Sequence, residues 1–389
     1  MTRITMRRVW WPLALIVLVW TVGAAVRSGR AEQASETNSP IPASASTPGA
    51  GATPAQTSSA QVFRADEVDA VARTLPRLHS LIVSRRGEVV FEEYYNGTRR
   101  DRPANIKSAS KSVISALVGA AVDRNLIPDV ETPILTYFPE LAGDADARKR
   151  EISVEDLLMM RPGLEGTSGR NYGAWVTSRN WVRHALARPM FAAPGEEMEY
   201  STGNTHLLSA ILTTATGKST LQFANEVLAK PLGFTLAPWP RDPQAVYFGG
   251  NDMLMTPRQM LAFGELYRNK GRVNGQQILS ADWVERSCEG RARNRRPGNP
   301  AFDPNGGIDP MRDRRYGYGW WVHEIGDYEA CFAWGYGGQY IFVLSELDLV
   351  LVTTSSPDVS DERRGHRRTV FEILERLVIA PMAGTAESR

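Results

Sequence analysis

The spacing of apolar and polar residues predicts strands at both ends of a folded region and helices between them. Residues 79–84 and 88–94 are two β-rich stretches separated by Arg85, Arg86 and Gly87, a pattern that indicates a hairpin. Further strands are expected at 319–324, 330–333, 340–344 and 349–354. Because short turns join neighbouring strands antiparallel, we expect an antiparallel sheet, with strands opening the folded region.

The middle of the chain carries helical patterns. In residues 108–125 the apolar positions cover a broad surface, which is typical of a helix buried on several sides. Shorter patterns, several of them begun by Ser, Thr or Pro, predict helices at 153–160, 181–187, 205–215, 219–229, 257–269 and 281–287, and a last helix at 368–379. Strands, then helices, then strands indicate a mixed α and β fold.

The front of the chain has a different pattern. Arg3, Arg7 and Arg8 precede an uncharged apolar run of 18 residues, 9–26, as an export signal requires. The run is longer than the usual signal core of about 7 to 15 residues, and it just reaches the length of about 17 residues that a spanning helix needs. Residues 1–31 are therefore either a cleaved signal peptide or a signal anchor that tethers the chain to a membrane through residues 9–26.

Residues 32–61 are rich in Ala, Ser, Thr, Pro and Gly and hold too few apolar residues to repay the entropy of ordering. This composition predicts a flexible linker, so the folded domain is expected at 62–389. An export segment followed by a spacer places that domain outside the cytoplasm, periplasmic or extracellular, and a retained anchor would hold it at the cytoplasmic membrane.

Composition narrows the functional classes. The 389 residues hold 45 Lys and Arg against 43 Asp and Glu, a net charge of +2, without a long basic block, so a nucleic-acid partner is not expected. Cys288 and Cys331 are too few for a disulfide framework; outside the cytoplasm they could pair, and two buried free thiols fit equally. The five histidines show no metal-site spacing such as His-Glu-x-x-His, so neither a metal nor a cofactor is expected.

Candidate chemistry lies at the start of the buried helix. Ser108 and Lys111 are three residues apart, which puts a hydroxyl and an amine on one face within hydrogen-bonding reach. The helix start supplies backbone N–H groups that favour an oxyanion, and burial would favour the neutral, basic form of Lys111. The alternative is a surface N-cap serine with a lysine that extends to solvent, and these residues alone favour neither.

Three ordered motifs resemble the penicillin-recognising serine hydrolases. They are Ser-Ala-Ser-Lys at 108–111, Tyr-Ser-Thr-Gly-Asn at 200–204 and Trp-Gly-Tyr-Gly-Gly-Gln-Tyr at 334–340. The resemblance runs through most of residues 75–380 and is closest to class C β-lactamase-like esterases and 6-aminohexanoate-dimer hydrolases. It implies an α/β (α+β) fold of the serine β-lactamase/DD-peptidase type, in which an antiparallel sheet is flanked by helices, with a helical subdomain and the nucleophilic helix between the two parts.

The resemblance also implies roles for single residues. Ser108 would be the nucleophile that forms an acyl-enzyme, and Lys111 would take its proton. Tyr200 would complete the proton relay as a phenolate or a hydrogen-bonded phenol, the alternative being a half-buried core tyrosine. The small-molecule substrate would be an ester or an amide.

The third motif would bind substrate. The resemblance makes residues 335–339 an edge strand lining the cleft, where the backbone N–H of Tyr336 joins that of Ser108 as an oxyanion hole. Gly335 and Gly338 would allow close approach, and the ring of Trp334 would contact the substrate. The alternative is a glycine-rich turn between two strands.

Departures from the family pattern bear on the substrate. Thr202 stands where many members have Asn, and Ala333 and Trp334 precede Gly335 where penicillin-binding members have Lys-Thr. Without a cation there for a substrate carboxylate, we expect an ester or a neutral or ω-amino amide. The rival hypotheses are a catalytically silent envelope protein that binds cell-wall peptide or a partner, and a β-lactamase or D-Ala-D-Ala peptidase.

Overall fold

The computed structural model describes residues 63–293 and 314–383. The leader expected at 1–31 and the linker expected at 32–61 lie outside the described residues. Within the described ranges, no helix combines the length and apolar character needed to cross a membrane.

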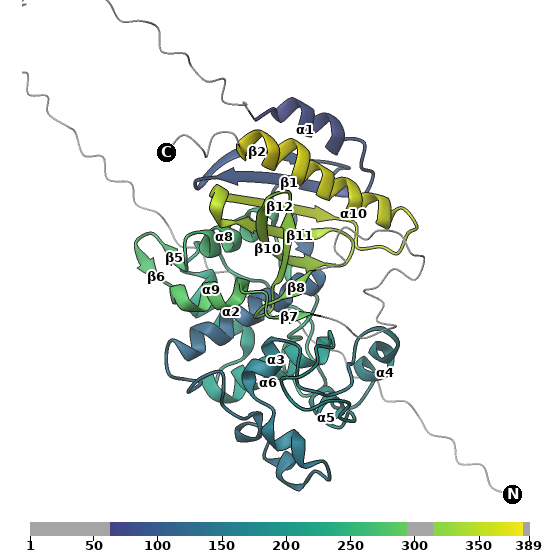
Figure 1. The fold of residues 1–389 in the computed structure, drawn as a ribbon, viewed down its shortest axis with the longest axis vertical. Coiled ribbons are helices and arrows are strands. Elements are labelled where there is room, and N and C mark those ends of the chain that lie inside the picture. The colour runs from purple at the N-terminus through teal and green to yellow at the C-terminus, as the bar shows by residue number, and fades with distance from the viewer. Residues whose placement is uncertain (1–62, 294–313, 384–389) are drawn as a thin grey trace, which may run out of the picture. The chain divides into compact units, whose positions relative to one another are not determined.

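The core of the fold is an eight-stranded sheet with the strand order β2-β1-β12-β11-β10-β9-β8-β7 (Figure 1). Its strands pair antiparallel, and the first hairpin lies beside the last strand because β1 pairs with β12. The strands are β1 Leu78–Arg85, β2 Glu88–Tyr94, β7 Ala292–Arg293, β8 Arg315–Tyr316, β9 Trp321–Ile325, β10 Tyr328–Gly335, β11 Gln339–Leu344 and β12 Leu349–Ser355. The predicted antiparallel sheet from both ends of the chain is confirmed.

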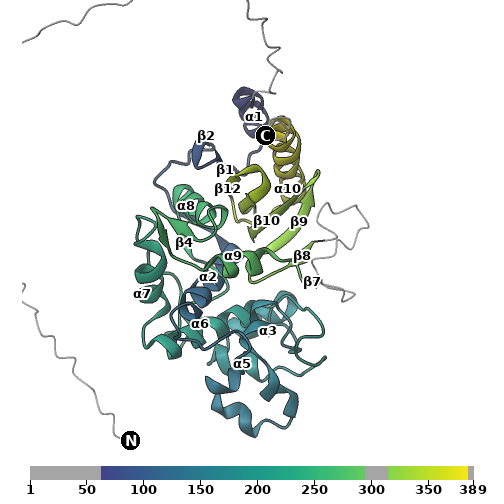
Figure 2. The same cartoon turned by 60° about the vertical axis from the view of Figure 1, so that its left-hand side comes forward.

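Helices cover both faces of the sheet (Figure 2). On one face, α8 (Pro257–Arg268) packs against β11 and β12, and a Cβ on its Gly264 would lie 2.6 Å from Val350 and 2.9 Å from Ile341. On the other face, Phe371 of α10 (Arg363–Glu372) meets the ring of Phe342 edge-on at 5.4 Å. Successive residues of β11 therefore face different helices, as the period of two in a strand requires.

A helical part of the fold follows α2 (Ser110–Val122) along the chain. Because α2 contacts both α6 (Thr202–Thr216) of this part and β10 of the sheet, it lies between the two. Two further pairs of short strands lie outside the large sheet, β3 Ala104–Asn105 with β4 Leu254–Met255, and β5 Arg272–Val273 with β6 Gln276–Gln277. The remaining helices are α3 Val154–Leu158, α4 Tyr172–Val176, α5 Trp181–Leu186, α6 Thr202–Thr216, α7 Thr220–Ala224, α9 Ala281–Cys288 and α11 Ala380–Ala383.

Two boundaries differ from the sequence expectation. A helix, α1 (Ala65–Ala72), precedes the first strand, so the expectation that strands open the fold is wrong; only Val68 and Ala72 of this short helix are buried, which left little apolar pattern to detect. The last helix begins at Arg363 rather than at 368, because its first turns are polar and its single buried residue there is His366.

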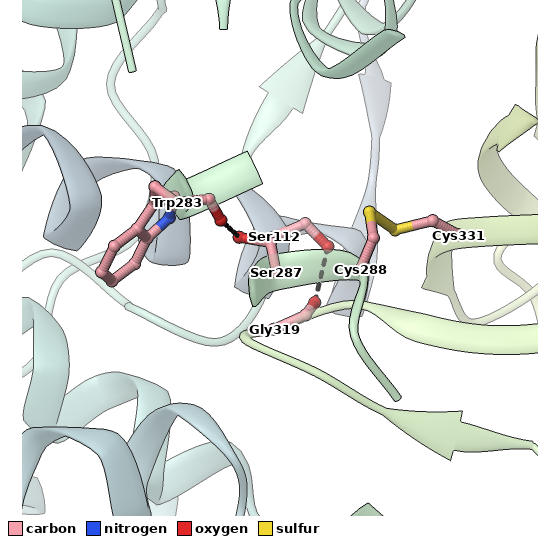
Figure 3. Close-up of a disulfide and its surroundings, with 6 residues drawn as sticks. All are labelled: Ser112, Trp283, Ser287, Cys288, Gly319 and Cys331. Atoms are coloured by element: carbon pink, nitrogen blue, oxygen red, sulfur yellow. Dashed lines mark hydrogen bonds between the residues drawn. A yellow bond between two sulfur atoms is a disulfide. The ribbon is translucent and has the colours of Figure 1, made fainter. Parts of the chain in front are cut away.

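The two cysteines form a disulfide that joins α9 to β10. Cys288 and Cys331 are bonded across a sequence separation of 43 residues, so the free-thiol alternative is wrong. Figure 3 shows this bond beside α2, where the Ser112 hydroxyl donates to the carbonyl of Gly319 at 2.7 Å. The disulfide therefore secures the strand whose end carries the third motif.

Candidate active site

Ser108 lies in a single 3-10 turn, Lys107–Ala109, that leads directly into α2. Lys107 has a left-handed φ of 50°, a conformation that costs a non-glycine residue about 1–2 kcal/mol. Its N–H donates to the Asn105 side chain at 3.0 Å, and its ammonium pairs with Asp252 at 3.0 Å. These contacts hold the turn, which leaves the Ser108 side chain half-buried and available.

Lys111 is buried at the start of α2, with 1% of its surface exposed. Its Nζ lies 3.2 Å from Ser108 Oγ, 3.4 Å from Thr202 Oγ1 and 2.6 Å from the carbonyl oxygen of Gly250. Burial lowers the pKa of Lys111 to about 7, although the charge of Asp252 opposes the shift. The lysine therefore does not extend to solvent, and about half of it is the free base near neutral pH.

The three partners of the Lys111 amine match both of its protonation states. A neutral amine has two N–H donors, which Gly250 and Thr202 accept, and these bonds aim the lone pair at the Ser108 hydroxyl. An ammonium has three donors, and all three neighbouring oxygens can accept them. Such a group can take a proton from the serine without losing a hydrogen bond.

Tyr200, just before α6, lies over the same amine. Its ring centroid is 4.9 Å from Lys111 Nζ, and its other contacts include the ring of Trp321, stacked at 5.5 Å. Burial raises the pKa of Tyr200 to about 12, although a hydrogen bond with Ser108 and the charge of Arg314 pull it down. The phenol is therefore the resting form, and it can donate a proton.

The glycine-rich third motif is a turn rather than an edge strand. β10 ends at Gly335, residues 336–338 form the turn, and β11 follows. Because β9, β8 and β7 lie beyond β10 in the sheet, the expectation of an edge strand is wrong and the turn alternative is right. A Cβ on Gly335 would lie 2.0 Å from the carbonyl oxygen of Ile106, two residues before Ser108. Glycine therefore lets the turn reach the nucleophilic segment.

The other candidate substrate-binding residues surround this turn. Trp334 is half-buried, Tyr336 is 37% exposed, and Gly338 is buried. The guanidinium of Arg314 lies 5.3 Å from the Trp334 ring, and that of Arg363 lies 4.4 Å from the Tyr336 ring. The chain positions before Gly335 carry no cation, yet the fold places two guanidiniums on the rings that flank it.

Sequence reasoning missed several residues of the site. The three motifs do not contain Gly250, Arg314 or Trp321, although Gly250 lies within residues 249–260, a stretch that shares in the family resemblance. Thr202 was noted only as a departure, and it proves to be a hydrogen-bond partner of Lys111. Among the described residues, no group of three or more His, Cys, Asp or Glu side chains could hold a metal ion.

Comparison with known proteins agrees with this fold. Residues 78–375 match the family described as Beta-lactamase. A 6-aminohexanoate-dimer hydrolase of Paenarthrobacter ureafaciens is 26% identical over 323 residues, which cover 77% of this chain and 80% of that protein.

Two solved structures share the fold at lower identity. A D-amino acid amidase from Ochrobactrum anthropi SV3 is 18% identical with a TM-score of 0.60, covering 80% of this chain and 99% of that one. A family VIII carboxylesterase is 18% identical with a TM-score of 0.61, covering 82% and 96%. The relatives are hydrolases, the resemblance noted in the sequence is confirmed, and the chain belongs to the beta-lactamase family.

Proposed function

We propose that this protein is an exported serine hydrolase that cleaves a small ester or amide through an acyl-enzyme. The observation that carries the proposal is the 3.2 Å contact between Ser108 Oγ and the buried Lys111 amine, whose pKa is about 7 because of its burial. A base with a pKa near the working pH combines the right protonation state with adequate strength.

Acylation begins when Ser108 Oγ attacks the substrate carbonyl and its proton moves to Lys111. The oxyanion of the tetrahedral intermediate accepts hydrogen bonds from the backbone N–H groups of Ser108 and Tyr336. Tyr200 donates its phenol proton to the leaving amine or alcohol as the C–N or C–O bond breaks, and Lys111 returns a proton to Tyr200. Water then attacks the acyl-enzyme, the same groups carry its proton, and Ser108 is released with its hydroxyl restored.

The substrate class follows from the third motif and from the relatives. Trp334 and Tyr336 offer aromatic surface for an acyl or leaving group, and the lysine typical of penicillin-binding members is missing before Gly335. The names of relatives include a dimer hydrolase, an amidase and a carboxylesterase. These features support esters and amides over β-lactams and D-Ala-D-Ala peptides.

Export is the second part of the proposal. Residues 1–31 have the charge and apolar pattern of a signal or an anchor, and the disulfide between Cys288 and Cys331 is the form that cysteines take in oxidising compartments. The domain would therefore work outside the cytoplasm, free or tethered through residues 9–26.

Ester hydrolysis by the full chain tests the catalytic proposal. We expect turnover of p-nitrophenyl acetate and butyrate to exceed that of a chromogenic cephalosporin, and Ser108→Ala to abolish turnover and fluorophosphonate labelling. Ser115→Ala is the matched control, because Ser115 is a buried serine about two turns further along, in α2. If wild type and Ser108→Ala were equally inert and unlabelled, a binding role in the envelope would take the lead.

The pH dependence gives a second test of the same proposal. Below pH 7 Lys111 becomes protonated and cannot accept the Ser108 proton, so kcat/KM for the butyrate ester should fall roughly tenfold per pH unit. An acid limb centred near pH 7 is expected. A rate that stays flat down to pH 5 would remove Lys111 from the role of base.

A further inference from the structure

Tyr200 and a buried guanidinium contact the same aromatic ring. The Tyr200 ring stacks on Trp321 at 5.5 Å with an angle of 22° between the planes. The Arg314 guanidinium lies 4.6 Å from the Trp321 ring centroid and 5.3 Å from that of Trp334. Arg314 itself is 8% exposed.

The sheet puts these side chains together. Arg314 directly precedes β8, Trp321 begins β9, and Trp334 lies near the end of β10, three successive strands of the sheet. The register sets Trp321 opposite Tyr316 on one side and Phe332 on the other. A cation and two indoles are therefore held side by side at the end of the sheet that meets Tyr200.

From this geometry we propose that Arg314 is a positioning residue for proton donation by Tyr200. Its charge, placed on the Trp321 ring that also contacts Tyr200, stabilises the phenolate that forms as the leaving group takes the Tyr200 proton, and its stacking holds that ring against Tyr200. This inference rests on the proposed hydrolase function and assigns a residue that the motifs do not contain.

The electrostatics of Tyr200 support this role. A phenolate at this half-buried position loses solvation, which is the main reason for the raised pKa of Tyr200, and the positive charge of Arg314 acts in the opposite direction. Indole rings are a good surface for a guanidinium, and the Trp321 and Trp334 rings surround that of Arg314 with apolar groups. A charge acts more strongly across such a medium than across water.

The proton transfer balances within the proposed cycle. The Oη–H bond of Tyr200 breaks as an N–H or O–H bond forms on the leaving group, and the electron pair of the scissile bond goes to that group. The Tyr200 phenolate then takes the proton that Lys111 received from Ser108. Arg314 keeps its own proton throughout, since a guanidinium is not deprotonated in proteins.

Leaving-group dependence distinguishes this role from a structural one. p-Nitrophenolate departs as a stable anion and needs little help from an acid, whereas ethoxide must be protonated as it leaves. We would compare kcat/KM for p-nitrophenyl butyrate and ethyl butyrate in the full chain. Arg314→Met removes the charge while keeping an unbranched side chain that can still contact the Trp321 ring, and Arg314→Lys keeps the charge.

We expect Arg314→Met to lower kcat/KM for the ethyl ester roughly tenfold or more, which is part of the roughly 10²–10⁴-fold that general acid catalysis supplies. For the p-nitrophenyl ester we expect kcat/KM to fall less than about threefold. Arg314→Lys should recover most of the ethyl ester activity. Tyr200→Phe should likewise lower kcat/KM for the ethyl ester more than for the p-nitrophenyl ester. Adding Arg314→Met to Tyr200→Phe should lower kcat/KM for the ethyl ester little further, because both changes act on the same proton donation. Arg291→Met is the control, because the Arg291 guanidinium also lies on an aromatic ring, that of Tyr318, at 5.1 Å. This variant should leave the ratio of kcat/KM for the two esters unchanged.

Equal losses for both esters in Arg314→Met would overturn the inference and leave the hydrolase proposal intact. If Arg314→Met did not fold, Arg314→Gln would serve as the neutral variant, with fluorophosphonate labelling of Ser108 reporting an intact nucleophile in each case. If Ser108→Ala still turned over both esters, both proposals would be overturned. The failure of this inference and the failure of the hydrolase proposal are therefore distinguishable.

Discussion

Replacing Lys111 by methionine should make the protein more stable below neutral pH while removing its activity. The folded protein holds this amine at a pKa of about 7, against an ordinary value of 10.5. Between these values the unfolded chain binds a proton that the folded chain does not, so wild-type stability rises with pH. The cost of burying the amine is fully present below pH 7 and disappears above pH 10.5. Lys111→Met carries no such cost at any pH.

The magnitude follows from the two pKa values. At about 1.36 kcal/mol for each pKa unit, the cost below pH 7 is roughly 5 kcal/mol. Between pH 6 and pH 10 wild type should gain roughly 4 kcal/mol relative to Lys111→Met. Packing differences between the two side chains cancel in this comparison, because they are the same at both pH values.

Urea unfolding at pH 6 and pH 10 measures this difference. Lys149→Met is a matched control: Lys149 is also buried, but its ammonium pairs with Asp144 at 2.9 Å, so its replacement removes an ion pair and should destabilise the fold at both values. If the wild-type and Lys111→Met curves kept the same separation at pH 6 and pH 10, Lys111 would not be held as the free base and the mechanism would need another base.

Three further predictions concern the rest of the site. Tyr200→Phe should lower ethyl ester turnover roughly 10²-fold or more with an unchanged far-ultraviolet spectrum; full turnover would exclude Tyr200 from the relay. Gly335→Ala should cost roughly 10²-fold in kcat for p-nitrophenyl butyrate, because its Cβ would meet the Ile106 carbonyl at 2.0 Å and shift the turn; an active variant would contradict the proposed oxyanion hole. Replacing Cys288 and Cys331 by serine should lower the free energy of unfolding by about 4 kcal/mol, since the bond closes a loop of 43 residues; an unchanged urea midpoint would refute that estimate.

The fold could be predicted from the sequence wherever the pattern is local. The hairpin of β1 and β2, the helix α2 and the helix α8 were recognised because their periodicity and turn or cap residues lie within a few positions of each other. The pattern does not predict the strands β7 and β8, because two residues each are too few to show a period. It does not predict the helix α1 either, because only two of its residues are buried.

The candidate site shows the same division. The sequence by itself determined that Ser108 and Lys111 share a helix face, since three residues of helix fix their separation. Only the tertiary structure decided that Lys111 is buried against the Gly250 carbonyl, that Tyr200 lies over its amine, and that Arg314 lies on the ring of Trp321. Such contacts depend on strand order and helix packing across long stretches of chain, and burial, which lowers the pKa of the lysine, is a property of the folded molecule that neighbouring residues in the sequence cannot supply.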